Sequence, residues 1–458
     1  MPKIVIIGGG LSGLTIAYLI IRSRPDADVT VLEAEGRPGG KIWTERTKGF
    51  ICEKGPNGFL DNKPKTLELC EALGIEPVRS NQNSKKRFIL SGGRLNALPE
   101  SPVSFIRSDL LSWGGKLRLL RELKAAMGPE DETVAEFITR RLGKEALEKL
   151  IDPMCSGIYA GDPYKMSIKS SFPRIKELEQ EYGSLIKALL AIRKQRKAVK
   201  GAAETVSAAP GGTLTSFRNG AETIISALSE RLGRRVELGG PVHAIERDGA
   251  SYKVYTPKDT ITADTVVIAT PAYASAGMLR DLDSGISGLL DRIPYPHVNV
   301  VCFGIKKEKV THPLNGFGFL VPNIEKRKIL GTLWDTSIFP NRAFEGLVLM
   351  RTMVGGAKHP DMAALDDYKL IEIVYDELKP ILGFRAEPDM AMVYRWHKAI
   401  PQYLYGHSRI LHELDERLEK YPNLYLAGNA YRGISINDCV ENGYRLAGEI
   451  LNKMKPLT

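Results

Sequence analysis

The sequence predicts an α/β fold, α+β overall, and three of its features lead to this prediction. Residues 3–33 follow the order strand, glycine turn, helix and strand, which is a βαβ unit with parallel strands. Short strand patterns return within residues 236–269 and at residues 424–427. Between the first unit and these later strands, residues 101–200 are rich in helix formers. A chain of 458 residues is long enough for two or three domains.

The first βαβ unit is the most regular part of the chain. Ile4–Ile7 is a continuous apolar run that ends in glycines, so we expect a buried strand there. Leu14, Ala17 and Ile21 then recur at helical spacing, and residues 28–33 form the next strand pattern.

Strand patterns later in the chain predict that the first sheet is completed late. We expect short strands at Val236–Leu238, Val242–Glu246, Tyr252–Tyr255 and Thr265–Ala269. Val266–Ala269 and Leu424–Ala427 are continuous apolar runs like the first strand, so each is expected to be a core strand of the first domain. A final helix from Val440 to Met454 is expected to pack on that domain.

The helical block contains a strongly basic segment. Leu117, Leu120 and Leu123 have helical spacing. Residues 184–200 contain no acid and carry the cations Lys187, Arg193, Lys194, Arg196, Lys197 and Lys200. This segment is either a solvated helix face or a surface that docks on anionic lipid, at about 1 kcal/mol per cation near the membrane. Gly201–Gly212 predicts a loop that leads back to the sheet.

Composition limits the class of protein. A hydrophobic content of 43% and a charged content of 26% are typical of a folded globular chain. The five cysteines are never spaced as Cys-x-x-Cys, so we expect neither disulfides nor a metal site. Because residues 3–7 already form a strand pattern, we expect no signal peptide, and no apolar run is long enough to span a membrane. The net charge of +10 favours an anionic partner, but no nucleic-acid-binding pattern accompanies it, so no nucleic acid is expected.

The glycine turn after the first strand predicts a dinucleotide site. Its residues, Gly8, Gly9, Gly10, Leu11, Ser12 and Gly13, satisfy G-x-G-x-x-G between a strand and a helix. Gly8 permits the tight bend, Gly10 lets the backbone approach a pyrophosphate, and Gly13 lets the helix pack on the strand. The pyrophosphate lies at the helix N-terminus, where free N–H groups favour negative charge. Glu33 ends the second strand and is placed to accept hydrogen bonds from a ribose, which disfavours NADP.

Two stretches after Glu33 favour FAD. Arg37–Lys41 and Glu53–Pro56 each combine glycine with a cation, which suits a second pass of backbone along a diphosphate and flavin. With this arrangement the sequence resembles the FAD-binding amine oxidase superfamily. The resemblance implies a Rossmann-like FAD-binding domain of the amine oxidase type, with a mixed-sheet substrate domain and an inserted helical, membrane-associated domain. It also implies noncovalent FAD, because Cys439 lies beyond the final strand, whereas covalent attachment in this superfamily uses a cysteine well upstream of it.

Later segments resemble the protoporphyrinogen oxidases within this superfamily. They are Ser156–Asp162 with Ser167 and Phe172–Pro173, Gly316–Pro322, Leu330–Leu333 with Phe339–Pro340, Met353–Gly356, Arg395–His397, Pro401–Tyr403, Gly406–His407, Leu426–Asn429 and Gly433–Cys439. The resemblance runs in order from Lys3 to Leu451. It implies oxidation of protoporphyrinogen IX to protoporphyrin IX for haem, by removal of six electrons in three flavin-dependent steps. Oxygen or a respiratory acceptor is expected to receive the electrons.

The same resemblance assigns roles to individual residues. Arg87 is expected to pair with a substrate propionate, because a guanidinium forms a planar fork that fits a carboxylate. Leu320, Leu333 and Met353 are expected to line apolar walls, and Gly161 to offer its carbonyl to pyrrole N–H groups. Besides the first turn and Glu33, the implied cofactor contacts are Ala34, Gly40, Lys41, Gly55, Pro56, Asn57, Gly58, Val242, Trp396, Gly428, Gly433, Ile434, Ser435 and Ile436. No catalytic side chain and no metal are expected, since the flavin carries the chemistry.

The implied domains are discontinuous in the sequence. They are an FAD-binding domain of residues 1–85, 205–275 and 408–458, a substrate domain of residues 86–100 and 276–407, and a basic helical domain of residues 101–204. The helical domain is expected to contact an anionic membrane. The protein is then expected in the cytoplasm, peripheral on the inner face of the cell membrane, and a homodimer is a further expectation from the family.

Alternatives stay open from the sequence. A neighbouring branch acts on coproporphyrinogen III, and Lys63 stands where that branch also carries a lysine. An amine oxidase or a carotenoid desaturase shares the scaffold, and a binding module such as the Rab GDP-dissociation inhibitors lacks flavin. Arg87, beside Lys85 and Lys86, could equally be a solvated cation, and the apolar wall residues could be ordinary core.

Overall fold

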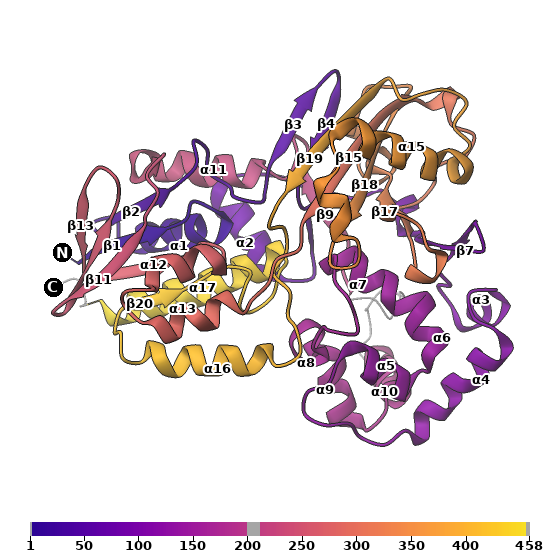
Figure 1. Ribbon diagram of the computed structural model, residues 1–458, viewed down its shortest axis with the longest axis horizontal. Helices are drawn as coiled ribbons and strands as arrows, with labels where there is room; N and C mark the ends of the chain where they lie inside the picture. Colours follow the sequence, from indigo (N-terminus) through magenta and orange to yellow (C-terminus); the bar gives the residue numbers. More distant parts are fainter. Residues whose placement is uncertain (1, 199–210, 455–458) are drawn as a thin grey trace.

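The computed structural model describes residues 2–198 and 211–454, and Figure 1 shows its three parts. A parallel sheet with its helices holds both chain ends, a second sheet lies beside it, and a group of helices lies below the second sheet. The predicted α/β architecture with a helical insertion is confirmed. The loop expected at Gly201–Gly212 lies largely outside the described residues.

The parallel sheet is assembled from strands that are far apart in the sequence. In spatial order these strands are β10 (Val236–Leu238), β2 (Asp28–Glu33), β1 (Lys3–Ile7), β14 (Thr265–Ile268) and β20 (Leu424–Leu426). Every neighbouring pair is parallel, with Ile4 opposite Val29 on one side and Thr265 on the other. The prediction that the runs near residues 266 and 424 return to the first sheet is therefore confirmed.

Alternation along β1 sends its side chains into two separate cores. Ile4 and Ile6 pack with the helices α1 (Leu11–Ser23), α2 (Pro64–Leu73), α11 (Thr223–Leu232) and α17 (Ile436–Lys453). Val5 and Ile7 pack on the opposite face with α12 (Ala272–Leu279), α13 (Ser284–Asp291), α16 (His407–Leu418) and the antiparallel strands β11 (Ala244–Asp248), β12 (Ser251–Tyr255) and β13 (Thr260–Ala263). The last helix begins at Ile436, earlier than the predicted Val440, because the Ser435 side chain caps it.

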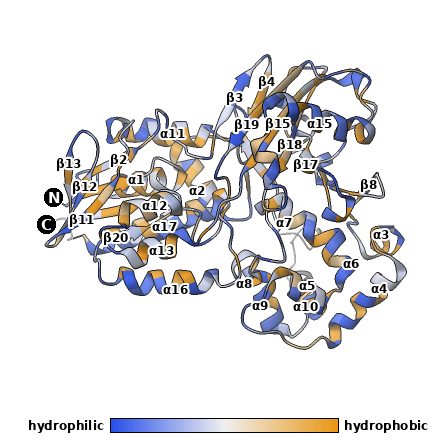
Figure 2. Cartoon of the chain, viewed as in Figure 1, coloured by the Kyte–Doolittle hydropathy of each residue, from blue (hydrophilic) through white to orange (hydrophobic). Residues whose placement is uncertain are grey.

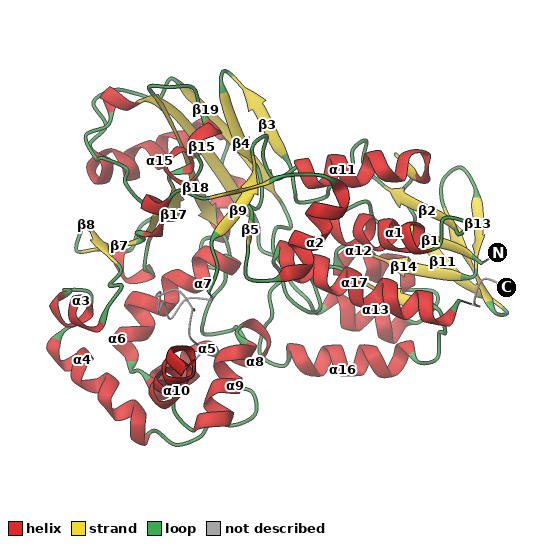
Figure 3. Ribbon diagram, turned by 180° about the vertical axis from the view of Figure 1, so that it is seen from behind, coloured by secondary structure: helices red, strands yellow, loops and turns green. Residues whose placement is uncertain are grey.

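The second sheet is mixed, as the predicted fold requires. Its strands in order are β19 (Met390–Trp396), β15 (Val298–Lys306), β18 (Leu347–Gly355), β17 (Ile329–Leu333), β16 (Gly318–Leu320), β7 (Phe88–Ser91) and β8 (Arg94–Ala97). Only β16 and β7 run parallel to each other in this sheet. The helix α15 (Asp367–Leu382) covers one face through an apolar core (Figure 3).

Short strands join the two sheets. The hairpin β3 (Thr44–Thr47) and β4 (Phe50–Glu53) lies at the edge of the second sheet, next to β19 (Figure 1). A small sheet contains β5 (Phe59–Leu60), β9 (Leu214–Phe217) and β6 (Pro77–Arg79). The stretch between β4 and β5 therefore runs from the hairpin beside the second sheet to this small sheet.

The inserted part is helical throughout, as predicted. Its helices are α3 (Pro102–Arg107), α4 (Trp113–Leu120), α5 (Val134–Arg141), α6 (Lys144–Ala146), α7 (Asp152–Tyr159), α8 (Ile168–Ser171), α9 (Pro173–Tyr182) and α10 (Leu185–Ala198). Phe137, Leu147 and Ile168 lie in its apolar core, together with Tyr403 from the later chain. Among these helices, α7 lies nearest the second sheet (Figure 1).

Candidate functional site

The predicted glycine turn has the geometry that the motif requires. Gly8 adopts a φ of +109°, and a Cβ there would lie 2.9 Å from the Ala269 carbonyl oxygen. A Cβ at Gly13 would lie 2.1 Å from the Gly8 oxygen, so only glycine fits at this position. Helix α1 begins directly after Gly10, with no side-chain cap and no acid in its first turn. The N–H groups of this turn are thus left for a ligand.

Glu33 lies against this turn. Its Oε2 accepts a hydrogen bond of 2.8 Å from the Gly9 N–H, and its Oε1 accepts one of 2.9 Å from the Glu35 N–H. The end of β2 therefore holds an acid beside the start of α1, where the sequence predicted it. Val242 is half-buried just beyond β10, whose last residue stands opposite Glu33, and Ala34 is exposed.

The second glycine pair packs directly on the first turn. The Gly39 N–H donates a 2.7 Å hydrogen bond to the Gly9 oxygen, and a Cβ at Gly40 would lie 3.6 Å from the Gly10 Cα. Arg37 holds this pair in place by donating from Nη2 to the Gly40 oxygen at 2.7 Å. Two glycine segments predicted separately are therefore one structural unit.

Lys41 and Trp396 meet at the junction of the two sheets. The Lys41 Nζ lies 4.7 Å from the centre of the Trp396 ring and donates to the Lys398 oxygen at 2.5 Å. Burial lowers the pKa of Lys41 to about 8. Trp396 donates from Nε1 to the Lys54 oxygen at 2.7 Å, which joins β19 to the second predicted flavin segment.

The segment Gly55–Gly58 is confined on both sides. A Cβ at Gly55 would lie 2.0 Å from the Lys41 oxygen, and one at Gly58 would lie 2.1 Å from the Thr215 oxygen. Pro56 lies between these glycines. The side-chain nitrogen and oxygen of Asn57 are both buried, and neither has a hydrogen-bond partner among the described residues. An amide with both polar atoms buried and unpaired indicates a missing polar ligand.

The start of α17 lies beside the start of α1. A Cβ at Gly443 would lie 2.9 Å from the Thr15 Cγ2, so the two helices approach closely. Gly428 and Gly433 both have positive φ, and the Gly433 N–H donates to the Tyr403 hydroxyl at 2.9 Å. Ile434 and Ile436 flank the capping residue Ser435. The structure thus brings the C-terminal predicted contacts to the start of the chain's first helix.

These features fit FAD. The space beside Gly10 holds no atom within 4 Å of a Cβ built there, so a diphosphate could approach the backbone closely. The uncapped start of α1 favours its negative charge, Glu33 lies where a ribose would bind, and Asn57 offers a free donor and acceptor. Gly8–Gly13, Glu33, Gly40, Lys41, Gly55–Gly58 and Gly433–Ile436 are the residues that would hold the cofactor.

The predicted substrate residues share one face of the second sheet. Leu320, Gly331 and Met353 stand opposite one another on β16, β17 and β18, and Leu333 is two residues beyond Gly331. Leu320, Leu333 and Met353 are half-buried, whereas residues of the other face pack on α15. Helix α7 lies on their face, since a Cβ at Gly157 would lie 2.6 Å from a Leu320 methyl carbon.

Arg87 and Gly161 lie at two sides of this face. Arg87 immediately precedes β7, which pairs with the Leu320 strand, and its guanidinium lies 5.3 Å from the centre of the Phe317 ring. Within residues 2–198 and 211–454, the Arg87 guanidinium has no carboxylate partner; the residue is exposed at the surface, but desolvation by the protein around the guanidinium lowers its pKa. Gly161 is buried just after α7, where a Cβ would lie 2.7 Å from the Gln402 Oε1.

Sequence reasoning missed two buried side chains beside the predicted site. Arg351 lies in the middle of β18 and contacts the Glu53–Gly55 backbone. Gln402 donates from Nε2 to the Tyr159 oxygen at 2.8 Å and so supports the turn that leads to Gly161. A signal for Arg351 was present, because a lone cation inside the apolar run LVLMRTMVG is unusual for a buried strand.

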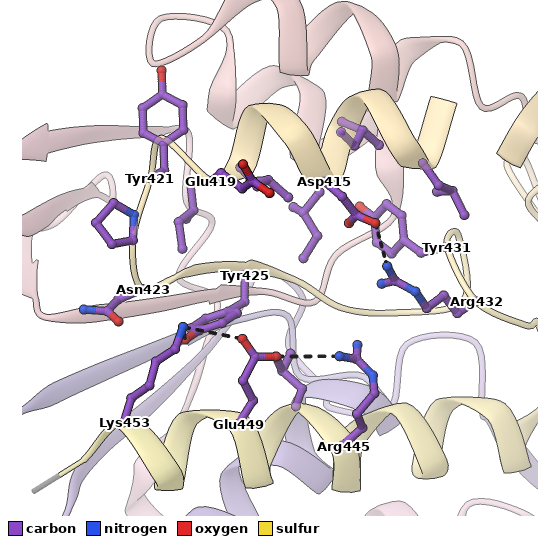
Figure 4. A pocket seen from close by; sticks show the side chains of 17 residues that line it. Asp415, Glu419, Tyr421, Asn423, Tyr425, Tyr431, Arg432, Arg445, Glu449 and Lys453 are labelled. Atoms are coloured by element: carbon purple, nitrogen blue, oxygen red, sulfur yellow. Dashed lines mark hydrogen bonds and ion pairs between the residues drawn. The ribbon is translucent and has the colours of Figure 1, made fainter. Parts of the chain in front are cut away.

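A separate pocket of about 460 Å³ lies between α16, β20 and α17 (Figure 4). Most of its charged side chains pair with one another, Arg432 with Asp415 and both Arg445 and Lys453 with Glu449. None of the predicted site residues lines it. The pocket is therefore distinct from the flavin and substrate positions.

The fold and the glycine turns define a flavoprotein of the dinucleotide-binding class. Residues 11–451 match the family described as flavin containing amine oxidoreductase, and the chain belongs to this family. The predicted cofactor, FAD, is confirmed by this membership.

Individual relatives are similar over almost the whole chain. Protoporphyrinogen oxidase 1 of Arabidopsis thaliana chloroplasts is 34% identical and aligns over 98% of this chain and 88% of its own. The coproporphyrinogen III oxidase of Bacillus subtilis (strain 168) is 32% identical, over 98% and 97% of the two chains. A crystal structure from Exiguobacterium sp. 255-15, described provisionally as a protoporphyrinogen oxidase, has a TM-score of 0.85 at 29% identity and covers 99% of both chains. The reduced UDP-galactopyranose mutase, at 17% identity and a TM-score of 0.77 over 99% and 94%, shares the fold.

Proposed function

We propose that this enzyme oxidises protoporphyrinogen IX to protoporphyrin IX in haem biosynthesis. The observation that carries the proposal is the face formed by Leu320, Leu333 and Met353, with the unpaired Arg87 beside its outer strand. Half-buried apolar side chains suit the apolar body of a tetrapyrrole macrocycle, and a free guanidinium suits one of its carboxylates. Similar chains that carry the name protoporphyrinogen oxidase add independent support.

In this proposal the protein positions the substrate and FAD supplies the oxidising power. Leu320, Leu333 and Met353 exclude water from the macrocycle, and Arg87 sets its orientation through a propionate. The Gly161 carbonyl accepts from pyrrole N–H groups. No side chain is assigned as a general base, because each two-electron step removes one meso hydride and one pyrrole N–H proton from a substrate that gains conjugation; bound FAD would accept the hydride, and the proton would leave to solvent. Oxygen or a respiratory carrier takes the electrons afterwards.

We propose that the chain has three domains, each with its own function. Residues 1–85, 205–275 and 408–458 bind FAD, and residues 86–100 with 276–407 bind the substrate. Strands β7 and β8 lie at one edge of the second sheet, which supports the assignment of residues 86–100 to the substrate domain. Residues 101–204 form the helical domain, with α7 against the substrate face.

The second candidate substrate is coproporphyrinogen III, which the Bacillus subtilis relative is named for. From the sequence, Lys63 is the residue that leaves coproporphyrinogen III as an alternative substrate. In the structure its Nζ pairs with Asp438 at 2.9 Å and with Glu441 at 2.7 Å. A lysine already held by two carboxylates is less available to an additional propionate, which supports protoporphyrinogen with its smaller number of carboxylates.

Both porphyrinogens should be compared in one assay. We expect porphyrin fluorescence to rise above autoxidation with either substrate and kcat/KM to favour protoporphyrinogen. Arg87→Met should raise KM roughly tenfold or more, because hydrogen bonds to charged groups contribute about 1.5–3 kcal/mol. Lys85→Met, two residues away, is the matched control and should change KM little. If neither substrate is oxidised faster than the autoxidation rate, the proposal is wrong and amines become the next substrates to test.

We also propose peripheral contact with the anionic inner face of the cell membrane. Among the residues described, no helix is both long and apolar enough to cross a bilayer. Large apolar side chains are nevertheless exposed over α3, α4 and the turn that follows, namely Val103, Ile106, Trp113, Leu117, Leu120, Leu123 and Met127. Figure 2 shows hydrophobic residues alternating with hydrophilic ones along these helices. Lys116 and Arg118 lie on the same helix, so apolar and cationic groups adjoin.

This surface differs from the one expected from sequence. Helix α10 makes up most of the basic segment 184–200, and Leu189 and Leu190 are exposed on it beside Lys187 and Arg193. The last residues of this segment lie outside the described part of the chain. The larger apolar surface belongs to α3 and α4, so the membrane contact is proposed there, with α10 contributing charge.

Vesicle sedimentation tests this contact. Leu117→Glu with Leu120→Glu should abolish sedimentation with vesicles containing phosphatidylserine and leave turnover in detergent unchanged. Tyr368→Glu, on the exposed side of α15, is the control and should sediment like the parent. Equal sedimentation of both variants would overturn the assignment. Sedimentation equilibrium in the same buffers would test the expected homodimer.

A further inference from the structure

We propose that Arg351 is a positioning residue, which clamps the Glu53–Gly55 backbone and thereby places Asn57 against the flavin. It lies in the second sheet and so couples the substrate face to the cofactor segment. The inference depends on FAD binding and does not depend on which substrate is oxidised. Its first test, the Kd for FAD, can therefore succeed or fail independently of the porphyrinogen assay.

The guanidinium of Arg351 reaches across the junction between the sheets. Its Nη1 donates to the Glu53 oxygen at 2.7 Å and to the Gly55 oxygen at 3.0 Å. Its Nε donates to both carboxylate oxygens of Asp335, at 2.9 and 3.1 Å. Arg351 is 2% exposed and Asp335 is 1% exposed, so this pair is shielded from water. The carboxylate fixes the guanidinium, and the guanidinium fixes the backbone.

Three successive backbone carbonyl groups accept hydrogen bonds from side chains of the second sheet. Between the two carbonyls bound by Arg351, the Lys54 oxygen accepts the 2.7 Å hydrogen bond from Trp396. The carbonyls of residues 53, 54 and 55 are thus all held by side chains of β18 and β19. A stretch held in this way cannot shift along the sheet without breaking several hydrogen bonds. Asn57 follows only two residues later.

Unpaired atoms show that this arrangement serves a ligand. The Arg351 Nη2 is buried without a hydrogen-bond partner in the described part of the chain, and so are both polar atoms of Asn57. Leaving such buried groups unpaired is unfavourable, so a ligand that pairs with them would bind more tightly. A polar ring edge placed beside Gly55–Asn57 would satisfy them.

The surrounding charges balance, so the clamp requires no external ion. Arg342 is fully buried and pairs with the Glu53 carboxylate at 3.3 Å. The two guanidiniums of Arg351 and Arg342 are thus matched by the carboxylates of Asp335 and Glu53. Arg342 donates to the Phe217 oxygen and not to the Gly55 side of the segment. Arg351 alone of the two guanidiniums holds the backbone that leads into Asn57.

The test compares three variants of the full-length enzyme. Arg351→Lys keeps the charge but cannot bind Asp335 and two carbonyls at once. The double variant Arg351→Met with Asp335→Asn removes both charges, which protects folding from an unpaired buried carboxylate. Arg141→Met is the matched control, because Arg141 is fully buried and paired with Glu122 and Glu179 in the helical part, far from the flavin segment along the chain.

Three measurements separate positioning from general stability. They are the thermal midpoint of the apo-protein, the Kd for FAD, and the rate constant for anaerobic reduction of the bound flavin. We expect both Arg351 variants to weaken FAD binding about tenfold and to slow flavin reduction by a similar factor, with KM unchanged. Arg141→Met should lower the thermal midpoint and leave the FAD Kd and the reduction rate as in the parent. An FAD Kd and a reduction rate equal to the parent's in Arg351→Lys would overturn the proposal, as would equal losses in Arg141→Met.

Discussion

Replacing Gly10 or Gly13 with alanine separates the two reasons why the first turn needs glycine. Both residues belong to the same motif and both substitutions add one methyl group. At Gly13 the methyl group meets the protein itself, whereas at Gly10 it meets only the space assigned to the FAD diphosphate. The two variants should therefore lose different properties.

The structure sets the size of each effect. The Cβ of Gly13→Ala would lie 2.1 Å from the Gly8 oxygen, so α1 or the turn must move by about 1 Å to reach ordinary contact. Overpacking of this kind costs about 1–3 kcal/mol. Gly10 has φ −74° and ψ 175°, which alanine adopts freely, and no atom lies within 4 Å of its Cβ. Gly10→Ala should leave the apo-protein as stable as the parent.

Two assays on the same preparations distinguish these outcomes. Thermal unfolding of the apo-protein should show a lower midpoint for Gly13→Ala and an unchanged midpoint for Gly10→Ala. Titration with FAD, followed by quenching of flavin fluorescence, should show at least tenfold weaker binding for Gly10→Ala, since the methyl group keeps the diphosphate from the backbone. Gly288→Ala, in α13 with no atom near its Cβ, is the control and should bind FAD normally.

One result would refute this reasoning. If Gly10→Ala bound FAD as tightly as the parent, the open space beside Gly10 would not be the diphosphate position. If the apo-protein of Gly10→Ala unfolded at a lower temperature than the parent, the turn would be packed more tightly at Gly10 than the structure indicates.

Three further predictions concern charge. Burial lowers the pKa of Lys41 to about 8, and the phosphates of bound FAD should raise this pKa again. FAD binding at pH 9 should therefore take up a proton, which calorimetry in two buffers detects. Lys41→Gln should abolish the proton uptake. Burial by itself raises the pKa of Glu179, but hydrogen bonds from Lys176 and Arg141 outweigh it and hold this pKa at about 2, below the ordinary 4.5. The ionised Glu179 stabilises the folded protein fully above pH 4.5, and this contribution is lost as the pH falls toward 2. The thermal midpoint of the parent should therefore fall over that range, and that of Glu179→Gln should fall less steeply. Glu33→Ala should weaken FAD binding by more than tenfold with a smaller change in apo-protein stability, as titration and melting would show.

Helical periodicity predicted α4 but could not say which way its apolar side faces. Leu117 and Leu120 have the spacing of a core-facing helix, yet they are 63% and 60% exposed. Periodicity records only that apolar residues share one side of a helix, and the neighbouring elements decide whether that side is covered. We therefore propose the membrane contact on α3 and α4, whereas the sequence led us to expect it on the basic segment of residues 184–200.

The segments assigned to FAD binding were the most predictable part of the candidate site. Gly8–Gly13 and Glu33 could be assigned from sequence because strand, turn, helix and acid follow one another within one short unit. The remaining flavin and substrate contacts came from resemblance to a family. Their local patterns are compatible with ordinary core, as the half-buried Leu320 and Met353 show.

The sequence by itself determined the nucleotide-binding turn, the class of fold and the cofactor, since each depends on backbone geometry dictated by neighbouring residues. Only the tertiary structure decided that Arg351 meets Glu53, 298 positions earlier, and that Lys63 is held by Asp438. Such contacts arise from strand register and from the crossing of two sheets. No local pattern specifies either, because the free energy of a long-range contact depends on the whole packed chain.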